Sequence, residues 1–250
     1  MKNFIIIGVV LTLCACAGSV APSPSPPLLI TLPNQGSLVI LGLSPRMSTR
    51  ANELEAATED AARKASMYHW VYARFEEIEN IGLGFFDYYR ESNAWVEFDQ
   101  NLEKYIDRLS FDKDKDVTRN KDGTVYIRFT YPASFSGNVN YYFKRDQSGR
   151  PEWTIRPPVE IGGFIAGVGR SGRLDRFSDT VTRSYEAAAI SIASRAFTYM
   201  SSVDASIQNQ VESRVHRQSM GSLTQFLILE TWIDPENRAV WTLAVARPTN

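Results

Sequence analysis

The two cysteines of this chain restrict its folding more than any other feature, because both lie within the first sixteen residues. They stand in the segment 13–16, Leu-Cys-Ala-Cys, behind Lys2 and an apolar run over residues 4–13. A basic start, a short apolar run and a small residue before the cleavage point are typical of a secretory signal. We therefore predict a signal peptide over residues 1–15. The remaining chain has a single cysteine, Cys16, and must be stabilised by its core without disulfides or a cysteine metal site.

Cys16 is the predicted lipidation site. The apolar run before it is too short to cross a hydrocarbon layer, which needs about 20 helical residues, so we expect it to be removed. Cleavage after Ala15 leaves Cys16 at the amino terminus, as in bacterial lipoproteins that carry palmitate-type acyl chains. The alternative is an ordinary signal peptide with an incidental cysteine. Ala17, in place of an aspartate, favours the outer membrane, with the folded part in the periplasm or at the cell surface.

Charge and composition restrict the classes of partner that we expect for this chain. The chain has 27 basic and 28 acidic side chains, a balance that argues against nucleic acid or anionic lipid headgroups as bulk partners. Residues 16–36 form a predicted tether, because Pro22 to Pro27 favour an extended polyproline conformation. Lipid on Cys16 is then the predicted link to the membrane, and the tether holds the folded part away from it.

The remaining sequence predicts an α+β fold of two tandem, diverged units over residues 37–148 and 149–250, each with a long helix on a mainly antiparallel sheet. In the first unit we expect a strand over 38–43, a helix from about Asn52 with an apolar stripe from Leu54 to Phe75, a second helix over 93–109, and a hairpin turn at 120–123. In the second we expect a strand over 164–169, a helix over 178–203, and strands over 223–233 and 238–247 around a turn at 234–237. Residues 139–144 read as an extra strand, and 151–158 as an ordered connector with Trp153 and Ile155.

Several blocks of the second unit resemble the LPP-twenty lipoprotein family. They are Pro151-Glu152-Trp153, Pro157-Pro158, Phe164 to Gly169 with Ser171, the alanine-rich helix from Tyr185 to Ala196, and the close from Thr231 to Val245. The resemblance covers about residues 150–247, and Leu41-Gly42-Leu43-Ser44 suggests it weakly in the first unit. It implies a layout similar to the amino-terminal domain of flagellar assembly protein T. It also implies kinship with outer-membrane lipoproteins that build rings around flagellar motors, and with surface antigens.

No catalytic, cofactor-binding or metal-binding residues are predicted. Residues 167–172 have the glycine spacing of a dinucleotide fingerprint, but the expected acidic residue about 20 positions on is missing, which favours a tight turn with close helix packing. Residues 112–116 resemble the start of a calcium loop without its glycine and glutamate, and are better explained as a solvated charge run. His69 is expected to be a partly buried packing residue, and His216 lies in a polar stretch. The aromatic patches at 85–89 and 141–143 are core by default, or partner contacts if exposed.

These features predict a non-enzymatic, lipid-anchored envelope protein without a cofactor. Its expected role is structural, as a scaffold or assembly factor of a flagellar or other envelope ring, with envelope proteins or further copies of itself as partners. One alternative is a regulatory lipoprotein that reaches a cell-wall enzyme. A second alternative is a small-ligand binder that uses a cleft between the two units.

Overall fold

A computed structural model describes residues 36–81, 88–119, 123–135, 137, 139, 144–172, 176–197, 199–207 and 210–249. The predicted signal peptide, Cys16 and the tether up to residue 35 lie outside this range, as do most of the turn at 120–123 and of the strand at 139–144. No helix within it is long and apolar enough to cross a membrane.

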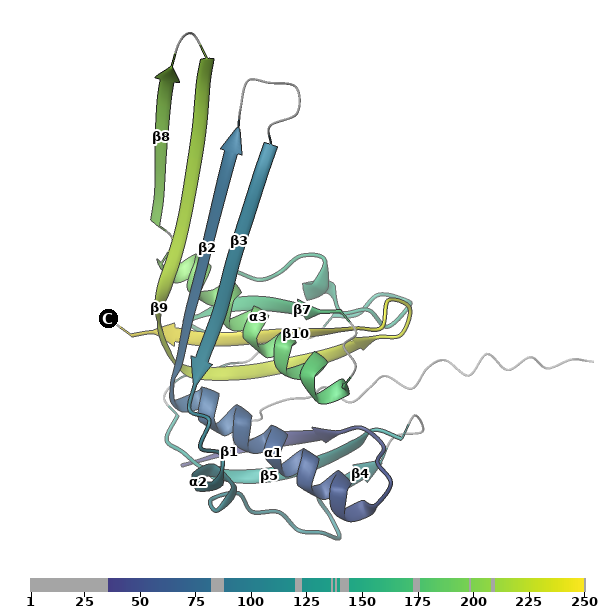
Figure 1. Ribbon diagram of the computed structural model, residues 1–250. Helices are drawn as coiled ribbons and strands as arrows, with labels where there is room; N and C mark the ends of the chain where they lie inside the picture. The colour runs from purple at the N-terminus through teal and green to yellow at the C-terminus, as the bar shows by residue number, and fades with distance from the viewer. Residues whose placement is uncertain are drawn as a thin grey trace, which may run out of the picture.

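The fold is α+β, as predicted, with two antiparallel sheets and two long helices (Figure 1). The helical elements are α1 (Arg50–His69), α2 (Glu103–Ile106), the 3-10 turn η1 (Glu152–Thr154) and α3 (Phe177–Phe197). The strands are β1 (Ser37–Ser44), β2 (Val71–Ile81), β3 (Tyr88–Phe98), β4 (Val117–Arg119), β5 (Val125–Pro132), β6 (Glu160–Ile161), β7 (Phe164–Ser171), β8 (Tyr199–Ile207), β9 (Gln210–Asp234) and β10 (Ala239–Pro248).

The smaller sheet has the order β1-β5-β4 and is covered by α1. The start of α1 differs slightly from the prediction, because Thr49 is the N-cap and its hydroxyl accepts a hydrogen bond from the Asn52 backbone N–H at 3.2 Å. The predicted hairpin is confirmed by the antiparallel pairing of β4 with β5, in which Arg119 faces Val125. This sheet and helix bury a shared core in which Leu38, Ile40 and Ala61 are fully inaccessible.

The larger sheet has the order β3-β2-β9-β10-β7-β6, with β8 paired to the free side of β9. The strands predicted over 164–169, 223–233 and 238–247 are confirmed as β7, the second half of β9, and β10. The turn at 234–237 is confirmed as well, since the Asp234 carboxylate accepts backbone N–H bonds from Glu236 and Asn237 at 3.0 and 3.1 Å. In the connector, η1 buries Trp153, whereas Ile155 is exposed.

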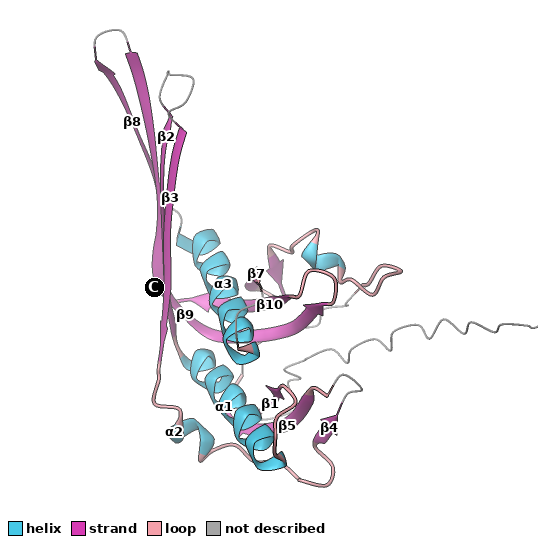
Figure 2. Ribbon diagram, turned by 45° about the vertical axis from the view of Figure 1, so that its right-hand side comes forward, coloured by secondary structure: helices cyan, strands magenta, loops and turns pink. Residues whose placement is uncertain are grey.

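A four-stranded arm projects from the body. It consists of β2, β3, β8 and residues 210–221 of β9, in the order β3-β2-β9-β8, with every neighbouring pair antiparallel. Both views show the arm reaching far beyond the end of α3 (Figures 1 and 2). Strand β9 runs through arm and body, and its 25 residues have a length of about 80 Å along the strand, at about 3.3 Å per residue.

The arm replaces segments that we expected to be helical. The first helix ends at His69, so Tyr72 and Phe75 belong to β2, and the helix expected over 93–109 is instead β3 followed by the short α2. The second long helix ends at Phe197 rather than at residue 203. The physical reason is long-range pairing: β2 hydrogen-bonds to β9, which lies far away in the sequence and gives no local signal.

A glycine contact recurs in the two halves of the chain. A Cβ atom at Gly42 in β1 would lie 2.1 Å from the Ala57 carbonyl oxygen of α1, and one at Gly169 in β7 would lie 2.0 Å from the Ser184 carbonyl oxygen of α3. Ala57 follows Gly42 by the same number of positions as Ser184 follows Gly169. Each half therefore follows the same order: a strand, a helix in close contact with that strand, and then a hairpin of the arm (β2 and β3, or β8 and β9).

Candidate functional site

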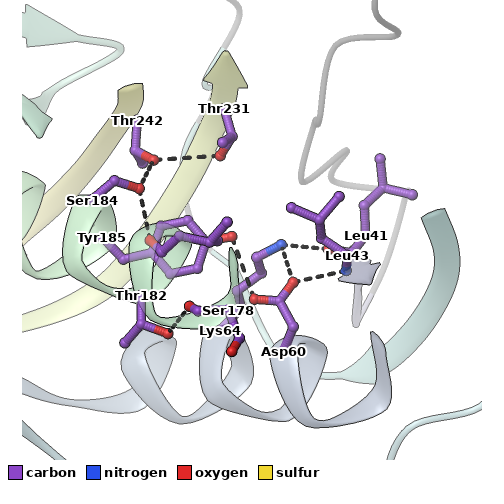
Figure 3. Close-up of polar contacts among 11 residues, drawn as sticks. Leu41, Leu43, Asp60, Lys64, Ser178, Thr182, Ser184, Tyr185, Thr231 and Thr242 are labelled. Atoms are coloured by element: carbon purple, nitrogen blue, oxygen red, sulfur yellow. Dashed lines mark hydrogen bonds and ion pairs between the residues drawn. The ribbon is translucent and has the colours of Figure 1, made fainter. Parts of the chain in front are cut away.

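A buried polar cluster joins α1 to the outer edge of β1 (Figure 3). Asp60 and Lys64 form an ion pair at 2.8 Å, with side-chain exposures of only 8% and 3%. The Asp60 carboxylate also accepts the Leu43 backbone N–H at 2.8 Å, and the Lys64 ammonium donates to the Leu41 carbonyl oxygen. Because β1 is an edge strand, these two side chains satisfy backbone groups that a further strand would otherwise satisfy.

The same cluster connects the two long helices. The Tyr185 hydroxyl of α3 donates to Asp60 at 3.4 Å, and Tyr185 is fully buried. Burial, together with the negative charge of Asp60, raises the pKa of Tyr185 well above its usual value of 10.0, so the phenol remains protonated. Lys64 and Tyr185 belong to elements that the sequence predicted, but the cluster itself was missed. A signal existed: opposite charges four residues apart on the alanine-rich face of a helix.

A second buried charge fixes the connector onto the large sheet. Glu230 of β9 is fully inaccessible, pairs with Arg145, and accepts the Trp153 indole N–H at 2.6 Å. Burial raises the pKa of Glu230, and Trp153 and Arg145 oppose that rise. This arrangement explains why the segment around Trp153 is ordered, as predicted, although it contains only one short 3-10 turn.

A pocket of about 480 Å³ lies where the small sheet meets β9. It is lined by Gly36, Tyr68, His69, Arg108, Pro132, Ala133, Ser134, Thr224 and Gln225. His69 and the Tyr131 hydroxyl are 2.8 Å apart, and the Arg108 guanidinium stacks over the Tyr131 ring at 4.6 Å. Gln225 has a positive φ of 52° at a β-bulge, a conformation that non-glycine residues rarely adopt. The pocket therefore combines hydroxyl, imidazole, amide and guanidinium groups.

The electrostatics of this pocket disfavour protonation of its histidine. Desolvation, and then the positive charges of Arg108 and Lys104, lower the pKa of His69 below its usual 6.5. Its ring packs against the rings of Tyr68 and Tyr131, although the residue as a whole is exposed at the end of α1. The expected packing role of His69 is therefore confirmed for its ring, whereas the residue as a whole is exposed. The side chain of His216 lies outside the described part of the molecule, as do the aromatic patches at 85–89 and 141–143, apart from the backbone of residues 88 and 89.

The glycine motif at residues 167–172 serves helix packing. A Cβ atom at Gly167 or Gly169 would come within 3 Å of α3 atoms, whereas one at Gly172 would meet nothing within 4 Å. Helix α3 begins only at Phe177, so its first turn does not follow the motif directly. These contacts favour the close-packing interpretation over a phosphate-binding loop. In the described part of the chain, no group of three or more histidine, cysteine, aspartate or glutamate side chains could hold a metal ion.

The base of the arm packs against α3, whereas β3, one of the two outer strands of the arm, is exposed. Phe197 packs directly on Gly221 of β9, and Arg217 pairs with buried Glu77 across the β2–β9 junction at 3.3 Å. On β3, Trp95 is 41% exposed and stacks on the Arg74 guanidinium at 4.6 Å. The arm thus presents an exposed edge that carries a large aromatic side chain.

Comparisons with known protein families, with curated proteins and with solved structures gave no match.

Proposed function

We propose that this chain is a lipid-anchored protein of a bacterial cell envelope with a structural role, and that copies of it assemble through the arm. The single observation that carries the proposal is the four-stranded arm, whose two outer strands β3 and β8 each pair on one side only within the described residues. An exposed strand edge presents unpaired N–H and C=O groups and is a template for pairing with another chain.

The proposed location rests on the leader. Cys16 follows an apolar run and a small residue, and the proline-rich segment behind it would hold the body away from the lipid. Two acyl chains suffice for stable anchoring, because each buried methylene contributes about 0.8 kcal/mol. We place the anchor in the outer membrane and the folded part in the periplasm, with envelope proteins as neighbours.

The proposed tandem organisation rests on the recurring glycine contact. Gly42 and Gly169 hold α1 and α3 against their strands in the same way, and a hairpin follows each helix. This repetition supports two diverged units, the second of which resembles the LPP-twenty lipoproteins. Under this proposal each unit contributes half of the arm, and the role in an envelope ring, flagellar or other, follows from that family resemblance.

The test is the size of the lipidated protein extracted gently from membranes. Mass photometry and negative-stain electron microscopy should show rings or large oligomers, and Cys16→Ala should remove the protein from the membrane fraction. A uniform monomer that crosslinks in cells to one cell-wall enzyme would contradict the structural role. It would favour the regulatory alternative instead.

The pocket beside His69 favours a second candidate function, the binding of a small polar ligand. Its hydroxyl, amide and imidazole groups converge with the Arg108 guanidinium, a combination typical of sites for small anions. Titration with citrate or inorganic phosphate, followed by the NMR signals of the His69 ring, tests it directly. Shifts that saturate and disappear in Arg108→Gln would support binding, and unchanged signals would exclude these anions as ligands.

A further inference from the structure

The arm has two open edges, one at β3 and one at β8. The directions of these strands allow β8 of one copy to pair with β3 of a second copy. Strands β2 and β8 run in one direction and β3 and β9 in the opposite direction, because every neighbouring pair is antiparallel. The outer strands β3 and β8 are therefore antiparallel to each other. When a second copy stands beside the first with its arm pointing the same way, its β3 can continue the sheet of the first copy at β8 without breaking the alternation.

Other pairings of the same edges fit less well. If β8 of one copy joined β8 of another, or β3 joined β3, the two strands would be parallel whenever both arms point the same way. The strands could be antiparallel only if the two arms pointed in opposite directions. Copies anchored through one lipidated end to one membrane face need arms that point the same way. This requirement leaves the head-to-tail pairing of β8 with β3, which closes into a ring when the rotation between copies divides a full turn.

The arm already contains such a junction inside one chain. The repetition of strand, helix and hairpin makes β8 the counterpart of β2, and β9 the counterpart of β3. The internal contact between β2 and β9 thus joins the first strand of one hairpin to the second strand of the other. A contact between β8 and the β3 of a second copy joins the same two kinds of strand. The two hairpins of one chain are therefore arranged like the hairpins of two neighbouring units in a head-to-tail array.

We infer that β8 of one copy pairs with β3 of the next copy in the register that β2 and β9 adopt within the chain. This inference rests on the proposed structural function and names the partner surface, which is a second copy of this chain.

The number of positions that separates Gly42 from its counterpart Gly169 fixes this register, because it assigns each strand residue of the first half a counterpart in the second half. The same offset carries Glu79 of β2 to Ser206 of β8. Within the hairpins Glu79 pairs with Arg90, and Ser206 pairs with Val211, so Arg90 is the counterpart of Val211.

The counterpart relation extends along the strand. Four residues further on, Ala94 of β3 is the counterpart of Val215 of β9. Glu79 and Val215 pair directly at the internal junction. Their counterparts Ser206 and Ala94 should therefore pair directly between copies.

The part of β3 that would meet the partner is exposed. A hollow of about 430 Å³ runs along residues 94–96 of β3 and is bounded on its other side by α3 and the end of β7, including Glu186 and Ile190. Ala94 and Trp95 are exposed there, and residues 92–95 and 97 are exposed along the same strand. The part of β3 that the inferred register assigns to the partner is thus accessible in the isolated chain.

Cysteine crosslinking of the full lipidated chain in cells tests the inference. The folded body has no cysteine of its own, so Ala94→Cys with Ser206→Cys places the only two free thiols at the inferred contact. Directly opposite positions in a sheet bring Cβ atoms about 4.5–5.5 Å apart, close to the range that a disulfide spans. We expect the double variant to form a ladder of covalent oligomers on a non-reducing gel, and the ladder to be lost on reduction.

Four control variants sharpen the result. Ala94→Cys with Ala205→Cys shifts one position onto the opposite face of the strand, so the ladder should be lost. Either cysteine alone should leave a monomer, and a dimer from Ala94→Cys alone would overturn the head-to-tail pairing. A ladder from Ser92→Cys with Met200→Cys, which lie level with each other along the arm, in place of the Ala94 and Ser206 ladder would overturn the register.

The native size of each variant, measured without crosslinking, separates this inference from the proposed function. Large assemblies without a ladder would overturn the β8–β3 junction and leave the structural role intact. Monomers alone, with thermal melting equal to that of the unchanged chain, would overturn both.

Discussion

Removing the carboxylate of Asp60 should strongly destabilise the fold. Asp60→Ala leaves the Lys64 ammonium buried without its partner and the Leu43 backbone N–H without its acceptor. An unpaired buried charge costs about 3–5 kcal/mol, and an unsatisfied buried N–H about 1–3 kcal/mol. Because a relaxing site partly satisfies both groups at once, we expect a combined loss of about 4 kcal/mol.

Urea unfolding and thermal melting measure this loss. At about 2–4 °C per kcal/mol for a chain of this size, the melting temperature of Asp60→Ala should fall by roughly 8–16 °C. The matched control is Asp60→Asn with Lys64→Met, which carries no buried charge and keeps an amide oxygen for the Leu43 N–H. It should lie within about 2 kcal/mol of the unchanged chain, because an apolar replacement of a buried ion pair is often nearly neutral. A loss below about 1 kcal/mol for Asp60→Ala, or a double variant less stable than either single variant, would refute the reasoning.

Three further predictions concern packing and ionisation. Gly169→Ala should lower the free energy of unfolding by about 1–3 kcal/mol or more, because its Cβ collides with α3, whereas Gly172→Ala should leave thermal melting nearly unchanged. The imidazole of His69 should titrate below 6.5 in a proton NMR pH series, and a higher value would contradict the effect of desolvation and of the neighbouring cations. Arg145→Met should destabilise by about 3 kcal/mol near neutral pH, since it leaves the buried carboxyl group of Glu230 without its cationic partner. Because burial raises the pKa of Glu230, the folded chain binds the proton more readily than the unfolded chain, so this deficit should shrink as the pH falls through the folded pKa; a deficit that grows would contradict it.

Local sequence patterns correctly predicted several strands and one turn of the body. The strand at 38–43, the strand at 164–169 and the closing strands around the turn at 234–237 are present in the structure. The turn could be predicted because Asp234 bonds to the backbone just after it, which is a local interaction. The order of the connector followed from Trp153, a side chain too large and apolar to remain in solvent.

The candidate sites were less accessible to sequence reasoning. Asp60 and Lys64 were visible as opposite charges one helical turn apart, but only the packing of α1 on the edge of β1 shows that they replace a missing strand. The pocket beside His69 brings together residues from α1, β5 and β9, which no spacing along the chain relates. Proximity of this kind depends on how the two sheets are placed.

The sequence by itself determined the α+β class and the strand-then-helix order in each half, because these depend on composition and on short-range periodicity. It also predicts a signal peptide over residues 1–15 and a lipidation site at Cys16. Only the tertiary structure decided that residues 71–81 and 88–98 form strands, and that the second helix ends at Phe197. Their apolar residues fit a helical stripe as well as an alternating strand, so local energetics left the choice nearly balanced. The hydrogen bonds that β2 makes to the distant β9 settled it, and the same pairing created the arm on which the proposed function rests.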